Sequence, residues 1–285
     1  MKRYTIRHIL VPTDFSRISL RALHHATIVA ERARCRLTLL NVVEPFGDAY
    51  GTSGMLAAAA RLEEKRKRES ERRLKNLGRT VAAKSGVKPG VVVAIGSVGT
   101  TINRIASGLR VDLIVMGTHG ASGFMESLLG SNTYRVVNLA DAPVMSVHTR
   151  SRARGFDHII YPVRDRAGAS DKFEQALAFA KLFRARVHVM GFTPPGRKKE
   201  ADAMRSLCAG VARKFSRAKT PVTTIYSDAN NPTDAVVRYA HKNKGSLVVI
   251  SEDSSIRLSE MFRGTFTKRI LHHMLSPVLS VGSRS

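Results

Sequence analysis

The stretch DLIVMGTHGASGFMESLLGS, residues 112–131, passes from an apolar run into a segment that holds four glycines. The apolar run lacks the alternation of a half-exposed strand, which is typical of a strand buried on both faces of a parallel sheet. Glycines that follow such a strand let the backbone approach an anion and expose its N–H donors. The stretch therefore predicts an α/β fold with a ligand crevice beyond the carboxyl end of this strand.

The chain contains two copies of this pattern. Residues 7–16, RHILVPTDFS, align with residues 157–166, DHIIYPVRDR, and residues 112–120 align with residues 246–254, SLVVISEDS. The two shifts differ by 16 residues, so the first copy carries an insertion between about residues 46 and 90. A long internal repeat indicates two copies of one domain. We place them at residues 1–150 and 151–285.

Within each copy, short apolar segments alternate with segments of helical periodicity. The strands expected in the first copy are 8–12, 36–43, 90–96, 112–117 and 142–149. This order predicts a parallel sheet covered by helices on both faces, with ligands bound beyond the carboxyl ends of the strands. Ser16 is expected to cap the first helix. The last strands of the two copies would leave exposed edges, so we expect them to pair as an internal pseudo-dimer.

Three segments follow strand ends and are expected to converge on one crevice: 12–14, 41–43 and 116–120. Asp14 supplies a carboxylate suited to a ribose diol, and Ser131 begins the last helix, where the helix dipole favours phosphate. An adenine ring can pack on Pro12, Val42 and Met116. Two alternatives stay open: Asp14 is a simple cap of the first helix, or the crevice is degenerate and holds no ligand.

The spacing Gly117-x2-Gly120-x9-Gly130-Ser131, together with VPTDFS at 11–16, resembles the universal stress protein family in its tandem form, over essentially the whole chain. The resemblance implies two α/β/α sandwiches, each with five parallel strands of the adenine nucleotide alpha hydrolase-like type. It also implies ATP binding, as in some members, and a regulatory role in stress. Carried over by position, the adenine and ribose side comprises Pro12, Thr13, Asp14, Val42 and Met116, and the phosphate cradle comprises Gly117, Gly120, Gly130, Ser131 and Asn132.

The second copy departs from this motif. Arg164 and Val163 replace Asp14 and Thr13, Ser251 and Ser254 replace Gly117 and Gly120, Glu252 and Asp253 are added, and Gly264 and Thr265 keep the last element. Side chains at glycine positions crowd a triphosphate, and carboxylates repel it. We therefore expect ATP, ADP or AMP in the first copy alone, with Mg²⁺ beside the phosphates as an open option.

Charge supports a second class of function. The net charge is +25, with a sequence pI near 11.0, and both copies contribute to it. Residues 61–76 form a predicted helix with eight basic residues and interleaved glutamates that can pair with them, and residues 196–199 add a basic loop. Because no aromatic residues are interleaved, nucleic acid would bind through its phosphates without sequence preference. The alternative is thus a non-enzymatic binder of nucleic acid or anionic surfaces with a vestigial crevice.

Other functional classes find little support. No apolar run reaches the roughly 18–20 residues of a membrane span, so a cytoplasmic location is expected. Cys35 and Cys208 are expected to be small buried hydrophobes rather than disulfide or zinc ligands. Adjacent histidines do not share a helix face, and no nucleophile-plus-base motif occurs, so any ATP hydrolysis would be slow. Contact of His119 with a phosphate and further association into a homodimer stay open.

Overall fold

The computed structural model describes residues 3–45, 53–118, 130–151, 155–164, 168–251 and 266–282. The first half contains β1 (His8–Pro12), α1 (Arg17–Ala33), β2 (Arg36–Val43), α2 (Ser53–Ser85), β3 (Gly90–Ile95), α3 (Val98–Gly108), β4 (Leu113–Gly117), α4 (Ser131–Leu139) and β5 (Val144–Val147). The second half contains β6 (His158–Val163), α5 (Gly168–Asp171), α6 (Phe173–Phe183), β7 (Arg186–Thr193), α7 (Lys198–Arg217), β8 (Val222–Asp228), α8 (Pro232–Lys242), β9 (Ser246–Ser251), α9 (Phe266–His273) and β10 (Val278–Val281).

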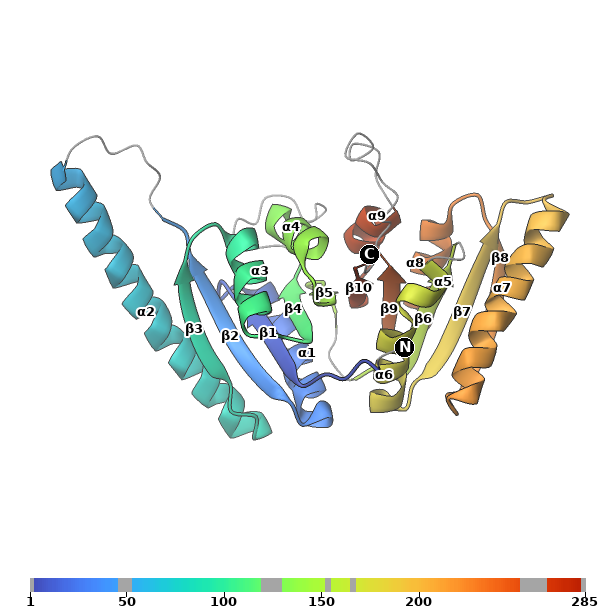
Figure 1. Ribbon diagram of the computed structural model, residues 1–285, viewed down its shortest axis with the longest axis horizontal. Helices are drawn as coiled ribbons and strands as arrows, with labels where there is room; N and C mark the ends of the chain where they lie inside the picture. Colours follow the sequence, from blue (N-terminus) through green and yellow to red (C-terminus); the bar gives the residue numbers. More distant parts are fainter. Residues whose placement is uncertain are drawn as a thin grey trace.

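All the strands join one sheet in the order β3-β2-β1-β4-β5-β10-β9-β6-β7-β8 (Figure 1). Each half contributes five strands that run parallel to one another, as the sequence predicts. The halves meet where β5 and β10 pair antiparallel, with Val278 opposite Ser146. The last strand of each half, which would otherwise be an exposed edge strand, therefore pairs with the last strand of the other half, as predicted.

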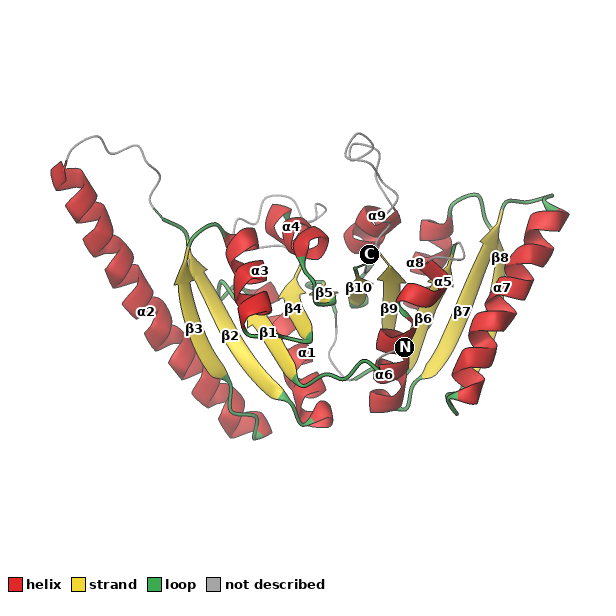
Figure 2. Ribbon diagram, viewed as in Figure 1, coloured by secondary structure: helices red, strands yellow, loops and turns green. Residues whose placement is uncertain are grey.

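Helices lie on both faces of the sheet, as Figure 2 shows. Ile9 and Val11 of β1 face a core shared with α1, α2, α6 and α7, whereas Leu10 faces a core shared with α3, α4, α8 and α9. Both faces of β1 are thus buried, which explains why its sequence is a continuous apolar run rather than an alternating one.

Ser151 and Phe156, which flank the junction between the halves, contact α1. His25 Nε2 lies 3.0 Å from Ser151 Oγ, and the Arg21 guanidinium donates to the Ser151 carbonyl at 2.7 Å. The Phe156 ring stacks on His25 and meets Phe183 of α6 edge-on. Burial lowers the pKa of His25 to about 4, so this imidazole is neutral at physiological pH.

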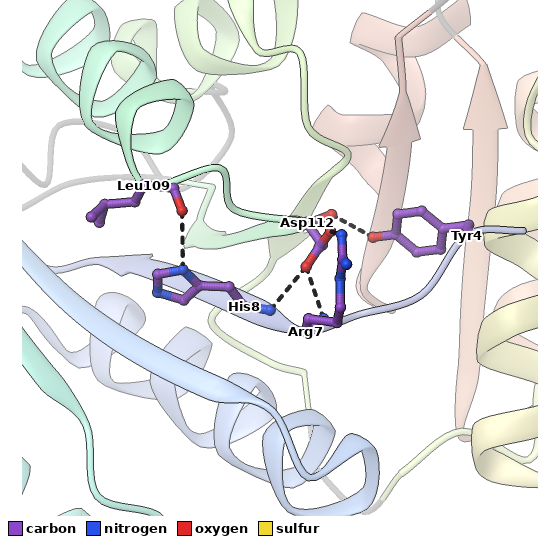
Figure 3. A network of polar contacts seen from close by, with 5 residues as sticks. All are labelled: Tyr4, Arg7, His8, Leu109 and Asp112. Atoms are coloured by element: carbon purple, nitrogen blue, oxygen red, sulfur yellow. Dashed lines mark hydrogen bonds and ion pairs between the residues drawn. The ribbon is translucent and has the colours of Figure 1, made fainter. Parts of the chain in front are cut away.

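The amino ends of β1 and β4 are tied together by Asp112 (Figure 3). Its Oδ2 accepts hydrogen bonds from the backbone N–H groups of Arg7, at 2.8 Å, and His8, at 3.0 Å, while Tyr4 donates to its carbonyl. His8 Nδ1 lies 3.3 Å from the Leu109 carbonyl. These contacts lie at the amino ends of β1 and β4, at the opposite end of the strands from the predicted crevice.

The halves differ most in one helix. Helix α2 has 33 residues and its counterpart α7 has 20, so the predicted insertion lengthens α2. No helix among the described residues is long and apolar enough to span a membrane.

Candidate functional site

The carboxyl ends of β2, β1 and β4 lie side by side, because β1 pairs in parallel with both neighbours. Pro12 ends β1, Val42 lies near the end of β2, and Met116 precedes the last residue of β4. Pro12 and Met116 are buried and Val42 is half-buried. The three residues predicted for the adenine side therefore lie at the carboxyl end of the sheet, which we call the carboxyl edge.

The turn from β1 into α1 is built by buried hydrogen bonds. Thr13 Oγ1 accepts from the Phe15 N–H at 3.0 Å and lies 2.9 Å from Ser19 Oγ. The Asn41 side chain donates to the Thr13 carbonyl at 2.7 Å. The Thr13 side chain therefore shapes the turn, and its exposed neighbour Asp14 projects from a fixed backbone.

Asp14 Oδ1 accepts hydrogen bonds from the Ser16 N–H, at 3.0 Å, and from the Ser16 hydroxyl, at 2.6 Å. Ser16 is the N-cap of α1, and its side chain accepts from the Ser19 N–H. The Ser16 prediction is confirmed, whereas the interpretation of Asp14 as the cap of α1 is wrong. These bonds orient the exposed Asp14 carboxylate at the carboxyl edge.

The start of α4 is anchored on the end of β4. The Gly130 N–H donates to the Thr118 carbonyl at 2.8 Å, and the Thr133 hydroxyl donates to the Gly117 carbonyl at 2.8 Å. The N-cap residue is Gly130, which has no side chain with which to cap this helix. Ser131 and Asn132 are exposed in its first turn, where helix N–H groups lack partners within the helix. This geometry suits an anion.

Gly117 has a packing role that the sequence did not reveal. A Cβ built on it would lie 2.8 Å from Ile18 Cγ1 and 3.3 Å from the Ile18 carbonyl carbon, so α1 approaches β4 too closely for any side chain. Gly120, His119 and Gly123 lie outside the described residues, as do Glu252, Asp253, Ser254, Gly264 and Thr265 of the second half.

Sequence reasoning missed three groups near this edge. Asn41 is a polar residue inside an apolar strand, a signal that was available, and Thr133 is one among several polar residues of α4. The Arg73 guanidinium of α2 lies 3.9 Å from the centre of the Phe15 ring. Nothing local in the sequence indicates that contact, because it depends on how α2 packs.

The equivalent edge of the second half is arranged differently. The Arg164 guanidinium lies over the Phe266 ring, 4.7 Å from its centre, and so links the end of β6 to the first residue of α9. Lys172 is buried, and its ammonium donates to the Pro162 carbonyl at 2.7 Å. By the repeat, Arg164 replaces Asp14 and Phe266 replaces Asn132. The second half therefore presents its own cation and aromatic ring where the first presents a carboxylate and an exposed helix start.

Other features of the described chain indicate no further chemistry at this edge. No group of three His, Cys, Asp or Glu side chains within it is arranged to hold a metal. Cys208 is buried as expected and Cys35 is half-buried, and burial raises the pKa of each thiol to about 11. A cavity of about 610 Å³ lies at the amino end of β4 instead, lined by the Arg3–Arg7 segment and the start of α6.

Comparisons with known proteins agree with this architecture. The model of the universal stress protein family matches residues 5–148 and 155–282. A universal stress protein of Methanocaldococcus jannaschii is 28% identical over 156 residues, which cover 51% of this chain and 96% of that protein. A universal stress protein A homologue of Coxiella burnetii is 30% identical over 141 residues, covering 50% and 95%. The crystal structure of a universal stress protein from Archaeoglobus fulgidus matches 97% of this chain and 98% of its own, with a TM-score of 0.78 and 18% identity.

Proposed function

Because this chain belongs to the universal stress protein family, we propose that its first half, residues 1–150, binds an adenine nucleotide and acts as a nucleotide-responsive regulator in the stress response. The observation that carries the proposal is the start of α4, whose N-cap residue is a glycine and which is tethered to the end of β4, where Ile18 of α1 approaches Gly117. A phosphate placed there would complete the helix cap and meet the positive end of the helix dipole.

The residues of this edge fit such a ligand. Asp14 is exposed and oriented by Ser16, so its carboxylate can accept hydrogen bonds from a ribose diol. Pro12, Val42 and Met116 supply an apolar wall for the adenine ring. Ser131 and Asn132 supply backbone N–H groups for the phosphates, and Gly130 before them adds no side chain at the helix start. The Gly117 carbonyl holds that helix start through Thr133, and Gly120 completes the motif by sequence.

In the second half, residues 151–285, the same edge does not bind nucleotide. The Arg164 side chain packs on Phe266, and the Lys172 ammonium is already bonded to the Pro162 carbonyl. The halves pair through β5 and β10 as an internal pseudo-dimer, so a single nucleotide acts on one side of a shared sheet. Its role is that of a conformational ligand, because the sequence carries no nucleophile-plus-base motif.

Calorimetric titration of the whole chain with ATP, ADP and AMP tests the proposal. We expect one nucleotide per chain and roughly tenfold or greater weakening in Asp14→Ala, because a hydrogen bond to a charged group contributes about 1.5–3 kcal/mol. Arg164→Ala is the matched control at the equivalent position and should bind as the parent does. Mass spectrometry of the ligand released on heat denaturation identifies the nucleotide.

Two results would contradict the proposal. One is an Asp14→Ala protein that binds adenine nucleotides as tightly as the parent. The other is a parent protein that binds none of the three, in which case the first crevice is vestigial.

A further inference from the structure

The solvent-exposed face of helix α2 carries a row of positively charged side chains. Six basic residues recur at spacings of four and three along it, and we call them the basic stripe: Arg61, Lys65, Arg68, Arg72, Lys75 and Arg79. All six are exposed. At 100° per residue, the six positions lie within about 40° of one line along the helix. From Arg61 to Arg79 the stripe extends over about 27 Å.

The opposite face of α2 holds the helix on the sheet. Leu74 is fully buried, and Leu77 and Val81 pack against the same core. Figure 1 shows α2 as the outermost helix of the first half, alongside β3. The basic stripe therefore lies on the face of α2 that points away from the sheet.

The glutamates of this helix do not neutralise the stripe. They lie to its sides, and the ion pair that the structure gives to a stripe residue joins Arg68 to Glu64, with Nε and Oε1 3.0 Å apart. Like charges three and four residues apart destabilise a helix by about 0.2–0.5 kcal/mol per pair. A face that only had to be solvated would gain from alternating signs, so this arrangement has an electrostatic cost in the free chain.

The counterpart helix shows that the fold does not require the stripe. In the central turns of α7 the exposed residues are mixed, with Asp202 and Ser206 beside Arg205, and Arg213 and Arg217 follow them. The stripe thus belongs to the longer helix of the first half.

We infer that the basic stripe of α2 is a docking surface for double-stranded DNA, which it contacts through the phosphates without reading the bases. A straight row of cations about 27 Å long matches the high linear charge of a duplex, one phosphate per 1.7 Å of axis. The stripe includes no aromatic side chain for stacking on unpaired bases, which disfavours single strands. The apolar face of α2 is occupied by the sheet, which disfavours insertion into a membrane.

Binding of a 20-base-pair duplex at increasing salt, followed by fluorescence anisotropy, tests the inference. With six phosphate contacts, the parent should lose about 10³-fold in affinity between 50 and 200 mM salt. The variant Lys65→Gln/Arg72→Gln/Lys75→Gln/Arg79→Gln should lose only about tenfold over the same range, because few contacts remain. Glutamine keeps the helix propensity, and circular dichroism checks the fold.

The matched control removes the same charge from the second half. Lys198→Gln/Lys199→Gln/Arg213→Gln/Arg217→Gln also lowers the net charge by four, and it should keep the salt dependence of the parent. Equal weakening in both variants would overturn the inference, since binding would then follow net charge alone. Preference for single strands, or for vesicles of phosphatidylserine over the duplex, would also overturn it.

Lysine acetylation of the parent protein tests the inference without any substitution, so its result does not depend on the folding of a variant. The duplex should protect Lys65 and Lys75 from acetylation, read by mass spectrometry, and leave Lys198 and Lys199 reactive. Unprotected stripe lysines in the bound complex would overturn the inference. The nucleotide proposal does not depend on this result, because Asp14→Ala leaves the stripe unchanged.

Discussion

At the carboxyl edge of the first half, the Asp14 carboxylate is exposed and bonded to Ser16, and α4 begins at the glycine Gly130. At the equivalent edge of the second half, the Arg164 guanidinium lies over Phe266. The strands that carry these groups occupy equivalent places in the strand order of the two halves, and within each half they run parallel to their neighbours. One sheet therefore supports two different edges, and the difference lies in a few residues beyond the strand ends. Fold and ligand binding are separable properties of this repeat.

The comparison extends beneath the surface. In the first half, Gly117 makes room for Ile18 of α1. In the second half, the repeat replaces Gly117 with Ser251 and Ile18 with Gly168. By this alignment the position on the strand gains a side chain and the position on the helix loses one. Packing therefore offers a reason for the loss of glycine at residue 251, besides the loss of a phosphate cradle.

The largest expected effect comes from giving the first half the charge of the second. Asp14→Arg should weaken adenine nucleotide binding on the order of 100-fold, because it removes charge-assisted hydrogen bonds of about 1.5–3 kcal/mol each. Calorimetric titration measures this, with thermal unfolding as a check, since the turn bonds to Ser16 are lost as well.

The reverse exchange sharpens the comparison. Arg164→Asp should not create a second site, because Ser251 and Phe266 remain in place, and the stoichiometry should stay at one nucleotide per chain. Two bound nucleotides would show that residue 164 alone separates the halves.

The next effect concerns stability. Gly117→Ser should destabilise the protein by about 1–3 kcal/mol, the usual cost of forcing extra atoms into a packed crossing. A Cβ there would lie 2.8 Å from Ile18 Cγ1. Urea unfolding followed by circular dichroism measures the loss.

Adding Ile18→Ala to that variant should cost less than the sum of the two single changes, because it opens the space that the serine needs. Ala106→Ser, a buried change in α3 away from this crossing, is the control and should show no such coupling with Ile18→Ala. Strictly additive costs would contradict the packing role of Gly117.

The parallel strands, the repeat and the start of α4 could be predicted because each has a local signal: continuous apolar runs, aligned blocks and a Gly-Ser step at 130–131. Contacts between distant segments could not. The bond from Asn41 to Thr13, the approach of Ile18 to Gly117 and the placement of Arg73 over Phe15 all depend on how elements pack. In the turn before α1 the local signal was sufficient, because the predicted cap Ser16 is confirmed and only the alternative that Asp14 caps the helix is wrong.

The smallest effect is expected at residue 188 of the second half, whose equivalent in the first half is Thr38. In the first half His8 Nε2 lies 2.8 Å from Thr38 Oγ1, whereas in the second half His158 Nδ1 lies 2.9 Å from His188 Nε2. Burial, with the neighbouring His158 and Arg186, lowers the pKa of His188 to about 4. The folded protein keeps His188 neutral while the unfolded chain takes up a proton near pH 6.5, so stability is lost as the pH falls from about 6.5 to 4.

His188→Thr gives the second half the residue of the first and removes this proton uptake. Between pH 7 and pH 4.5, we expect the free energy of unfolding to fall by about 1–2 kcal/mol less in the variant than in the parent. This figure allows for solvent screening. Urea unfolding at a series of pH values measures the difference. His25 also has a lowered pKa. Because the parent and the His188→Thr variant both contain His25, its contribution to the pH dependence cancels. The substitution also removes the contact between His188 Nδ1 and the Tyr239 hydroxyl, 3.0 Å apart, so the comparison uses the slope with pH rather than the stability at pH 7. Parallel curves would show that His188 does not carry the acid sensitivity of the second half.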